Sequence, residues 1–315
     1  MPAEQKAAAP LKVLVTIPHY YDTSTLKNAS NARKMDASRR AAALAATISS
    51  LHQTLGPRQG LIDGRTNGIH RVNRPINLGV AICTTGDKHL LPALEKSGKV
   101  KGLYYHESTT VEPALLGYAC HAQLKKVLGV FDWYCYMEDD LALTDPQFFT
   151  KLAWFNTLAK DERAVLLPNR CEADIGELFH KLYIDGNHAD ATLGPRFQDI
   201  SQRPSIEGEA YGQTVRFQRV DNAHAGSFFL TAAQMAHWAA QPDFLDNDGS
   251  FVDPIASAAT LGLMRHFKVY KPARENADFL ELRHTMNYYL GKRMRFGQKP
   301  DAQATPAAKP AGAKK

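Results

Sequence analysis

The chain has 315 residues, of which 44% are hydrophobic and 22% are charged, and its formal net charge is +6. These values are typical of a globular protein with one large domain or two closely packed ones. No apolar run approaches the roughly 18 residues that a membrane-spanning helix needs, and the first residues lack the pattern of a secretory signal. We therefore expect a soluble, cytoplasmic protein.

The positive charge is concentrated at the C-terminal end of the chain. Residues 292–315 contain seven basic side chains and one acid, a net charge of +6 (seven minus one), so residues 1–291 are balanced. A nucleic-acid-binding domain would carry its excess charge on the folded body, and we expect no nucleic-acid partner. Residues 1–10 and 292–315 are rich in Ala, Pro and Lys, which predicts disordered ends. The alternative for the basic tail is weak peripheral contact with the inner face of a membrane.

The four cysteines are widely spaced and form no CxxC pair. Two of them, Cys83 and Cys135, lie within apolar, strand-like runs. This pattern indicates reduced core thiols in a cytosolic protein and not a disulfide or zinc framework.

Strand-like and helix-like segments alternate along the chain. The expected order is strand 12–21, helix 31–56, strands 78–86 and 101–107, helix 112–129, strand 132–137, helix 146–159 and strand 164–169. A polar, turn-rich segment follows at 172–222, then helical segments at 228–241 and 251–267, and residues 284–291 close the folded part. The alternation predicts an α/β fold, a single large domain with a mainly parallel central sheet flanked by helices.

The stretch "DWYCYMEDDLALTDP" (132–146) ends an apolar strand with three adjacent acids, Glu138, Asp139 and Asp140. Adjacent carboxylates repel one another, so a compensating charge is needed, and a divalent cation is the leading candidate. Oxygen ligands favour Mg²⁺ or Mn²⁺. On an extended backbone, Glu138 and Asp140 point to one side and Asp139 to the other. The alternative is that these are surface acids that cap the following helix.

The segment "MEDDLALTDPQFF" resembles the metal-binding segment of GT-A-fold glycosyltransferases, and is most similar to that of the N-acetylglucosaminyltransferase I type. The preceding "ALLGYACHAQLKKVLGVFDW" resembles a helix of that family, so the specific match covers roughly residues 105–155. The resemblance implies that Asp140 binds the metal directly, with Glu138 beside it, and that Asp139 contacts the ribose or sugar of the donor. A C-terminal histidine near the metal is common in this fold, which points to His284; its alternative is a structural role.

Such enzymes commonly place an acidic base at the start of a late helix, which the resemblance assigns to Asp253, with Asp248 in reserve. The base would take a proton from the acceptor hydroxyl. The alternative for Asp253 is an N-cap, because Pro254 and an Ala-rich segment follow it.

The loop after the first strand frames the nucleotide in this fold. The donor-binding candidates are therefore Pro18, His19, Tyr20, Asp22, Asp87, Asp139 and Arg39. The aromatic rings would stack on the base, Asp22 or Asp87 would bond its edge, and Arg33, Arg39 or Arg40 would reach the diphosphate. For the arginines, a solvated helix face is an equal alternative.

Taken together, these features predict a metal-dependent hexosyl- or N-acetylhexosaminyl-transferase. It would use Mn²⁺ or Mg²⁺ to transfer a sugar from a nucleotide-diphosphate donor, UDP-linked, to a hydroxyl of a carbohydrate, lipid-linked or protein acceptor, with inversion. Residues 11–171 would bind the donor, and residues 172–291, with the polar insert, the acceptor. Dinucleotide, P-loop and α/β-hydrolase motifs are absent. The alternatives are a metal-dependent nucleotidyltransferase or phosphoesterase, and a non-catalytic carbohydrate-binding protein.

Overall fold

The structure is a computed structural model of the chain and describes residues 9–22, 36–72, 76–98, 100–175, 179–188 and 190–290. The two segments expected to be disordered, 1–10 and 292–315, lie outside the described residues, apart from Ala9 and Pro10. Arg33, one of the arginines expected near a diphosphate, also lies outside them.

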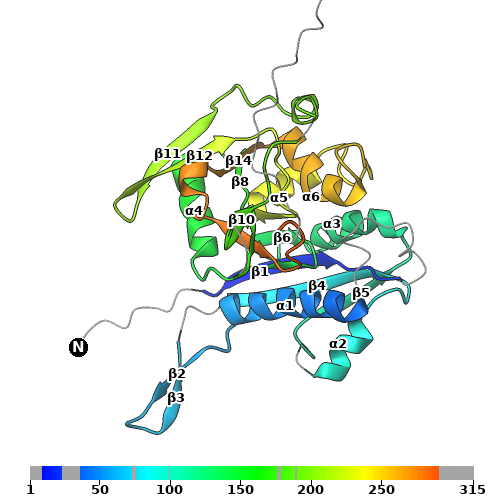
Figure 1. Cartoon of the computed structure of the whole chain (residues 1–315), viewed down its shortest axis with the longest axis vertical. Helices are drawn as coiled ribbons and strands as arrows, with labels where there is room; N and C mark the ends of the chain where they lie inside the picture. The colour runs from blue at the N-terminus through cyan, green and yellow to red at the C-terminus, as the bar shows by residue number, and fades with distance from the viewer. Residues whose placement is uncertain are drawn as a thin grey trace, which may run out of the picture.

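A five-stranded sheet forms the centre of the protein (Figure 1). Its strands in spatial order are β13 (Ser227–Thr231), β6 (Trp133–Met137), β1 (Leu11–Pro18), β4 (Ile76–Thr85) and β5 (Tyr105–Thr109). The last four run parallel to one another, and β13 is antiparallel to β6 at one edge. The prediction of an α/β fold with a mainly parallel central sheet is confirmed.

Helices cover both faces of this sheet (Figure 1). One face carries α1 (Ala37–Leu55) and α2 (Leu91–Ser97), and the other carries α3 (Leu116–Lys126), α5 (Ala232–Ala239) and α6 (Pro254–His266). Successive residues of β1 alternate between the two apolar layers, with Val15 in the α1 layer and Leu14 in the α3 layer. Because both faces are buried, these strands are continuous apolar runs in the sequence.

The described part of the predicted helix 31–56 is α1. Asp36 caps its first turn, and the Asp36 carboxylate accepts hydrogen bonds from the backbone N–H groups of Ser38 and Arg39 at 2.8 and 3.0 Å. The apolar residues at helical spacing are buried along one face, namely Leu44, Ile48, Leu51 and Leu55.

The prediction of a helix over 228–241 is wrong in its first part. Residues Ser227–Thr231 form β13, in which Phe229 pairs with Cys135 of β6, and α5 begins only at Ala232. Thr231 ends the strand and caps the helix through a reciprocal pair of hydrogen bonds with Gln234. The open edge of β6 decides the outcome, because pairing there satisfies backbone groups that a helix would leave unpaired on the sheet.

Several other boundaries differ from the expected ones. The strand expected at 101–107 is β5, which begins at Tyr105, and the helix expected at 112–129 is a 3₁₀ turn, η2 (Pro113–Leu115), followed by α3. The helix expected at 146–159 is α4 (Phe148–Ala159), and the strand expected at 164–169 is divided between β8 (Ala164–Leu166) and β9 (Asn169–Ala173).

Two four-stranded sheets are built mainly from the second half of the chain. The first contains, in spatial order, β11 (Ser205–Ala210), β12 (Gln213–Arg219), β14 (Lys268–Pro272) and β8. The second contains β10 (Lys181–Tyr183), β9, β15 (Glu281–His284) and β7 (Leu141–Ala142). Short 3₁₀ turns lie at η3 (Gly194–Arg196) and η4 (Arg274–Asn276). The polar segment 172–222 therefore contains regular strands, which its weak periodicity did not predict.

A two-stranded hairpin, β2 (Gly60–Asp63) and β3 (Gly68–Arg71), follows α1 and extends away from the rest of the protein (Figure 1). This hairpin was not predicted from the sequence. Among the described residues, no helix combines the length and the apolar character that crossing a bilayer requires.

Candidate functional site

The acid triplet lies at the carboxyl end of β6, where parallel sheets of this kind bind ligands. Asp139 and Asp140 are buried, at 7% and 8% exposure. Each acid has a cationic partner within the protein: Glu138 meets Arg170, Asp139 meets Arg40, and Asp140 meets His284. The repulsion between the carboxylates is therefore compensated by side chains, and a metal ion is not needed for that purpose alone.

Asp139 is held from two sides. The Arg40 guanidinium, from the first turn of α1, donates from Nη2 to both Asp139 carboxylate oxygens at 2.6 Å. His19, at the end of β1, lies with Nδ1 2.6 Å from Asp139 Oδ2. The other ring nitrogen of His19, Nε2, accepts a hydrogen bond from the Leu90 backbone N–H at 3.1 Å, so Nδ1 is the nitrogen that donates to Asp139.

This arrangement bears on the expected stacking role of His19. The His19 ring is fully buried and both of its nitrogens are occupied, so it is not available as a stacking surface here. Instead it ties the end of β1 to the acid triplet and to the loop before α2.

His284 is brought to Asp140 by strand pairing. β15 pairs antiparallel with β7, and this places His284 directly opposite Leu141, the residue after Asp140. His284 Nε2 lies 3.4 Å from Asp140 Oδ2, and His284 Nδ1 lies 2.7 Å from Glu172 Oε1. Burial alone would lower the pKa of His284, but hydrogen bonds with Asp140 and Glu172 raise it to about 10. Burial alone would raise the pKa of Asp140, but the hydrogen bond and charge of His284 hold the pKa of that carboxyl well below its usual range.

The donors around Asp140 fit a divalent cation. The second carboxylate oxygen, Asp140 Oδ1, is buried and has no hydrogen-bond partner. With His284 Nε2, once that nitrogen has released its proton, it forms a pair of candidate ligands, and Glu172 behind His284 completes the carboxylate–histidine arrangement common at metal sites. Among the described residues there is no group of three or more His, Cys, Asp or Glu side chains that could hold a metal. Two ligands suffice for Mg²⁺ or Mn²⁺ when phosphate and water oxygens complete the coordination sphere.

The Glu138 carboxylate contacts other partners than the Asp140–His284 pair. Its Oε2 lies 3.3 Å from Arg170 Nη1, and its Oε1 lies 3.8 Å from His224 Nε2. Burial raises the pKa of Glu138 to about 7, against the opposing charge of Arg170. Gly226 packs against the same carboxylate: its φ is +57°, and a Cβ there would come within 2.5 Å of Glu138 Oε2. A glycine is therefore required at this position.

A buried ion network supports Arg170. Arg170 Nε donates to Asp185 Oδ1 at 2.8 Å, and Lys271 Nζ donates to Asp185 Oδ2 at 3.0 Å and to the His224 carbonyl at 2.6 Å. Both Lys271 and Asp185 have side chains only 2% exposed. Arg170, Asp185, Lys271 and Glu172 were not predicted from the sequence, because they lie on or beside strands of the second half that only tertiary pairing brings to the acid triplet.

The donor-binding candidates on two loops lie close together. Lys88 Nζ pairs with Asp22 Oδ2 at 2.7 Å, and the Tyr21 N–H donates to the Lys88 carbonyl at 3.0 Å, so the loops after β1 and β4 are joined. Tyr20 donates to Asp22 at 3.3 Å. Pro18 ends β1 beside them, and Asp87 is exposed on the second loop.

The arginine that faces the acids is Arg40 and not Arg39. Arg39 is exposed on the outer side of α1, whereas Arg40 reaches Asp139 and, at 3.4 Å, Asp140. The sequence offers both arginines as candidates, and the orientation of α1 directs Arg40 toward the acids.

Asp253 caps α6, as its alternative assignment predicts. Its Oδ1 accepts hydrogen bonds from the N–H groups of Ile255 and Ala256 at 2.9 and 2.8 Å, so capping uses one of the two carboxylate oxygens. Burial raises the pKa of the Tyr136 phenol, and the charges of Glu138 and Asp253 both add to the rise. Asp253 therefore lies within electrostatic reach of the same phenol as the acid triplet.

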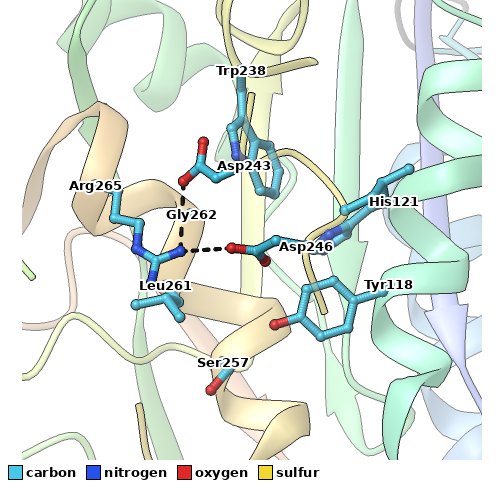
Figure 2. Close-up of a pocket in the computed structure, with 10 residues that line it drawn as sticks. Tyr118, His121, Trp238, Asp243, Asp246, Ser257, Leu261, Gly262 and Arg265 are labelled. Atoms are coloured by element: carbon cyan, nitrogen blue, oxygen red, sulfur yellow. Dashed lines mark hydrogen bonds and ion pairs between the residues drawn. The ribbon is translucent and has the colours of Figure 1, made fainter. Parts of the chain in front are cut away.

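Asp248 lies in a different environment. Arg265 of α6 pairs with the carboxylates of Asp248, Asp246 and Asp243. Figure 2 shows the Arg265 guanidinium between Asp243 and Asp246, beside a small pocket. Hydrogen bonding from Ser250, with the contact to Arg265, lowers the pKa of Asp248. An ion-paired carboxylate of lowered pKa is a poor proton acceptor, which weakens Asp248 as the reserve base.

His121 of α3 lines the opposite side of this pocket (Figure 2). It is 1% exposed, packs edge-on against Trp238 with ring centroids 4.9 Å apart, and neither ring nitrogen has a hydrogen-bond partner. Burial lowers the pKa of His121 from 6.5 to about 3, although a weak contact with the Ala258 backbone opposes the shift. The folded protein therefore holds this ring neutral in mild acid.

This burial predicts acid sensitivity. Below about pH 6.5 the unfolded chain binds a proton at residue 121 that the folded protein does not, so stability is lost as the pH falls toward 3. We expect this residue to cost about 2–3 kcal/mol between about pH 7 and about pH 4.5. His121→Phe should remove that part of the loss, measured by denaturant unfolding at both pH values. His70→Gln, in the exposed hairpin, is the control and should retain the whole loss; an equal loss in His121→Phe would contradict the prediction.

The fold and site together define an α/β protein with a buried, charge-paired acid cluster at the carboxyl end of its parallel sheet. No protein-family model matches the chain, and a search of curated proteins finds no significant match. Among solved structures it is similar to residues 1–349 of TarS from S. aureus, with 7% identity and a TM-score of 0.42, over 88% of this chain and 61% of that one. It is also similar to GalNAc-T7 solved with UDP, GalNAc and Mn²⁺, with 11% identity and a TM-score of 0.43, over 87% of this chain and 43% of that one.

A third similar structure is mouse xyloside xylosyltransferase 1, with 10% identity and a TM-score of 0.35, over 82% of this chain and 83% of that one. The chain spans less than two thirds of the length of the first two proteins. These likenesses are too distant to assign an activity to this chain.

Proposed function

We propose that this protein is a cytoplasmic, GT-A-like glycosyltransferase that transfers a hexosyl or N-acetylhexosaminyl group from a UDP-sugar to a hydroxyl acceptor. One observation carries the proposal. Asp140 Oδ1 is buried without a partner beside His284, at the carboxyl end of a central parallel strand. The resemblance of the segment around Asp140 to the metal-binding segment of GT-A enzymes agrees with this placement.

In this proposal Asp140 and His284 hold Mn²⁺ or Mg²⁺, which when bound neutralises the charge of the departing nucleoside diphosphate. Arg40 fixes the position of the Asp139 carboxylate, and a carboxylate has about four acceptor sites, so Asp139 can still accept from a donor hydroxyl. Tyr20, Asp22 and Asp87 border the base. Residues 172–291 form the acceptor side, for a carbohydrate, lipid-linked or protein acceptor.

Asp253 is the proposed base. It takes the proton of the acceptor hydroxyl while that oxygen attacks the anomeric carbon, which gives inversion. Its capping bonds orient the carboxylate at the start of α6 without using its second oxygen.

Metal-dependent stabilisation tests the function directly. We expect the thermal midpoint to rise when one UDP-sugar is added together with Mn²⁺, and to rise less with either alone, because donor and cation share one site. Stabilisation by bare nucleoside triphosphates would favour a nucleotidyltransferase instead. No response to any sugar nucleotide would contradict the proposal.

Asp253→Asn tests the base. Asparagine caps helices as well as aspartate does, so folding and donor binding should be retained while turnover falls by about 10²–10⁴-fold. Asp248→Asn is the matched control, and should turn over nearly as fast as the wild type because that carboxylate is already paired with Arg265. Undiminished transfer by Asp253→Asn would show that the base lies elsewhere.

A further inference from the structure

The β2–β3 hairpin is the part of the molecule that the proposed function does not use. It forms a sheet of its own and extends from the C-terminal end of α1, while Arg40 contacts the acid triplet at the other end (Figure 1). The helix rises about 1.5 Å per residue, so Arg40 and Leu55 are about 22 Å apart. The hairpin therefore has no part in the catalytic site and needs a separate explanation.

Three large apolar side chains of the hairpin are unusually exposed: Leu61 at 61%, Ile62 at 78% and Ile69 at 76%. In the strand pairing, Ile62 lies opposite Ile69 and Gly60 lies opposite Arg71, so these four residues share one face. We call this the isoleucine face. An exposed apolar pair on a projecting element indicates a surface that binds another molecule or a membrane.

The charges of the hairpin are divided between its two faces. Arg71 lies on the isoleucine face, whereas Asp63 lies on the other face and pairs with His70 at 3.3 Å. Residues 57–72 contain three arginines and this one aspartate, a net charge of +2 with histidine neutral (three minus one). The arginines, Arg58, Arg65 and Arg71, are all exposed. The isoleucine face is thus apolar at its centre, basic at its border and free of acids.

We propose that the isoleucine face of the β2–β3 hairpin docks onto an anionic membrane surface. The two isoleucines enter the boundary between headgroups and acyl chains, and the arginines pair with lipid phosphates. A second copy of the chain fits less well, because residues 57–72 carry a net charge of +2 in each copy and two such hairpins repel each other. The polar turn at residues 64–67 limits the hairpin to a position along the interface and excludes deep insertion.

The test is sedimentation of the full chain with phosphatidylcholine vesicles that contain or lack phosphatidylglycerol. We expect binding to the anionic vesicles, and a loss of about tenfold in partitioning for Ile62→Ser/Ile69→Ser. Leu61→Ser removes an exposed apolar side chain from the opposite face, and it should bind as the wild type does. Thermal unfolding of each variant confirms that the body is folded.

A second measurement reports on the hairpin itself. The four native cysteines are buried, so Ile62→Cys can be labelled selectively with an environment-sensitive dye. Its emission should shift to the blue on anionic vesicles, and the same dye on Leu61→Cys should shift less.

Three results would overturn the proposal. The first is no binding to anionic vesicles. The second is binding that Ile62→Ser/Ile69→Ser leaves undiminished, which would assign it to the basic segment 292–315. The third is a fall in oligomeric mass on Ile62→Ser/Ile69→Ser, measured by light scattering, while the binding to anionic vesicles stays the same. That result would assign the isoleucine face to a second copy of the chain.

Discussion

Replacing Arg40 with methionine is expected to destabilise the protein by about 3–5 kcal/mol, the usual cost of leaving one partner of a buried ion pair alone. The Arg40 side chain is 13% exposed and that of Asp139 is 9% exposed, so the Asp139 carboxylate is largely shielded from water. Among the described residues, the Asp139 side chain has hydrogen-bond partners in Arg40 and His19, so His19 alone would remain after the change. Guanidinium unfolding of the variant and the wild type measures the difference.

Two further variants make this result specific. Arg39→Met changes the neighbouring, exposed residue of the same helix, and it should alter stability by no more than about 0.5 kcal/mol. The double variant Arg40→Met/Asp139→Asn should recover much of the loss, because an asparagine oxygen can still accept from His19 and residue 139 no longer carries an unpaired charge. If Arg40→Met is no less stable than Arg39→Met, the pair does not stabilise the fold.

Replacing Asp140 with asparagine is expected to reduce sugar transfer by about 10²–10³-fold while the protein remains folded. The change keeps the shape of the side chain and its oxygen, but it removes the charge beside His284 and the proposed cation ligand. Transfer is measured as nucleotide release from the UDP-sugar that gives the largest thermal shift with Mn²⁺. The same variant should also lose the additional thermal stabilisation that Mn²⁺ gives with the donor.

Asp63→Asn is the matched control for this experiment. It removes an acid from the hairpin, at the far end of α1 from the site, and should transfer at the wild-type rate. Wild-type transfer by Asp140→Asn would place Asp140 away from the reacting diphosphate, and the proposed site would then be wrong. A loss of activity together with a loss of folding would be recognised by circular dichroism.

The acid triplet shows why the sequence argument for a metal was incomplete. Three adjacent carboxylates need compensation, but the sequence does not indicate where it comes from. The structure supplies Arg40, Arg170 and His284, one for each acid. The remaining argument for a cation is the unpartnered Asp140 Oδ1, and not the crowding of the acids.

The apolar runs and helix ends are local properties, and the sequence by itself determined them. Strand β6, the cap residue Asp253, and the position of the acids after a buried strand all follow from short stretches of chain. These features were sufficient to predict an α/β fold with a mainly parallel sheet. They depend on backbone hydrogen bonding and on which side chains avoid water, and both act over a few residues.

Only the tertiary structure decided which charge meets which acid. Whether Arg39 or Arg40 faces Asp139 depends on how α1 is rotated about its axis, and a rotation of one residue exchanges them. His284 reaches Asp140 because β15 pairs with β7, and residues 227–231 form a strand because β6 offers an open edge. Such pairings join segments 90 to 145 residues apart, for example β6 with β13 and Asp140 with Thr285, and their energy comes from contacts that no short stretch of sequence contains.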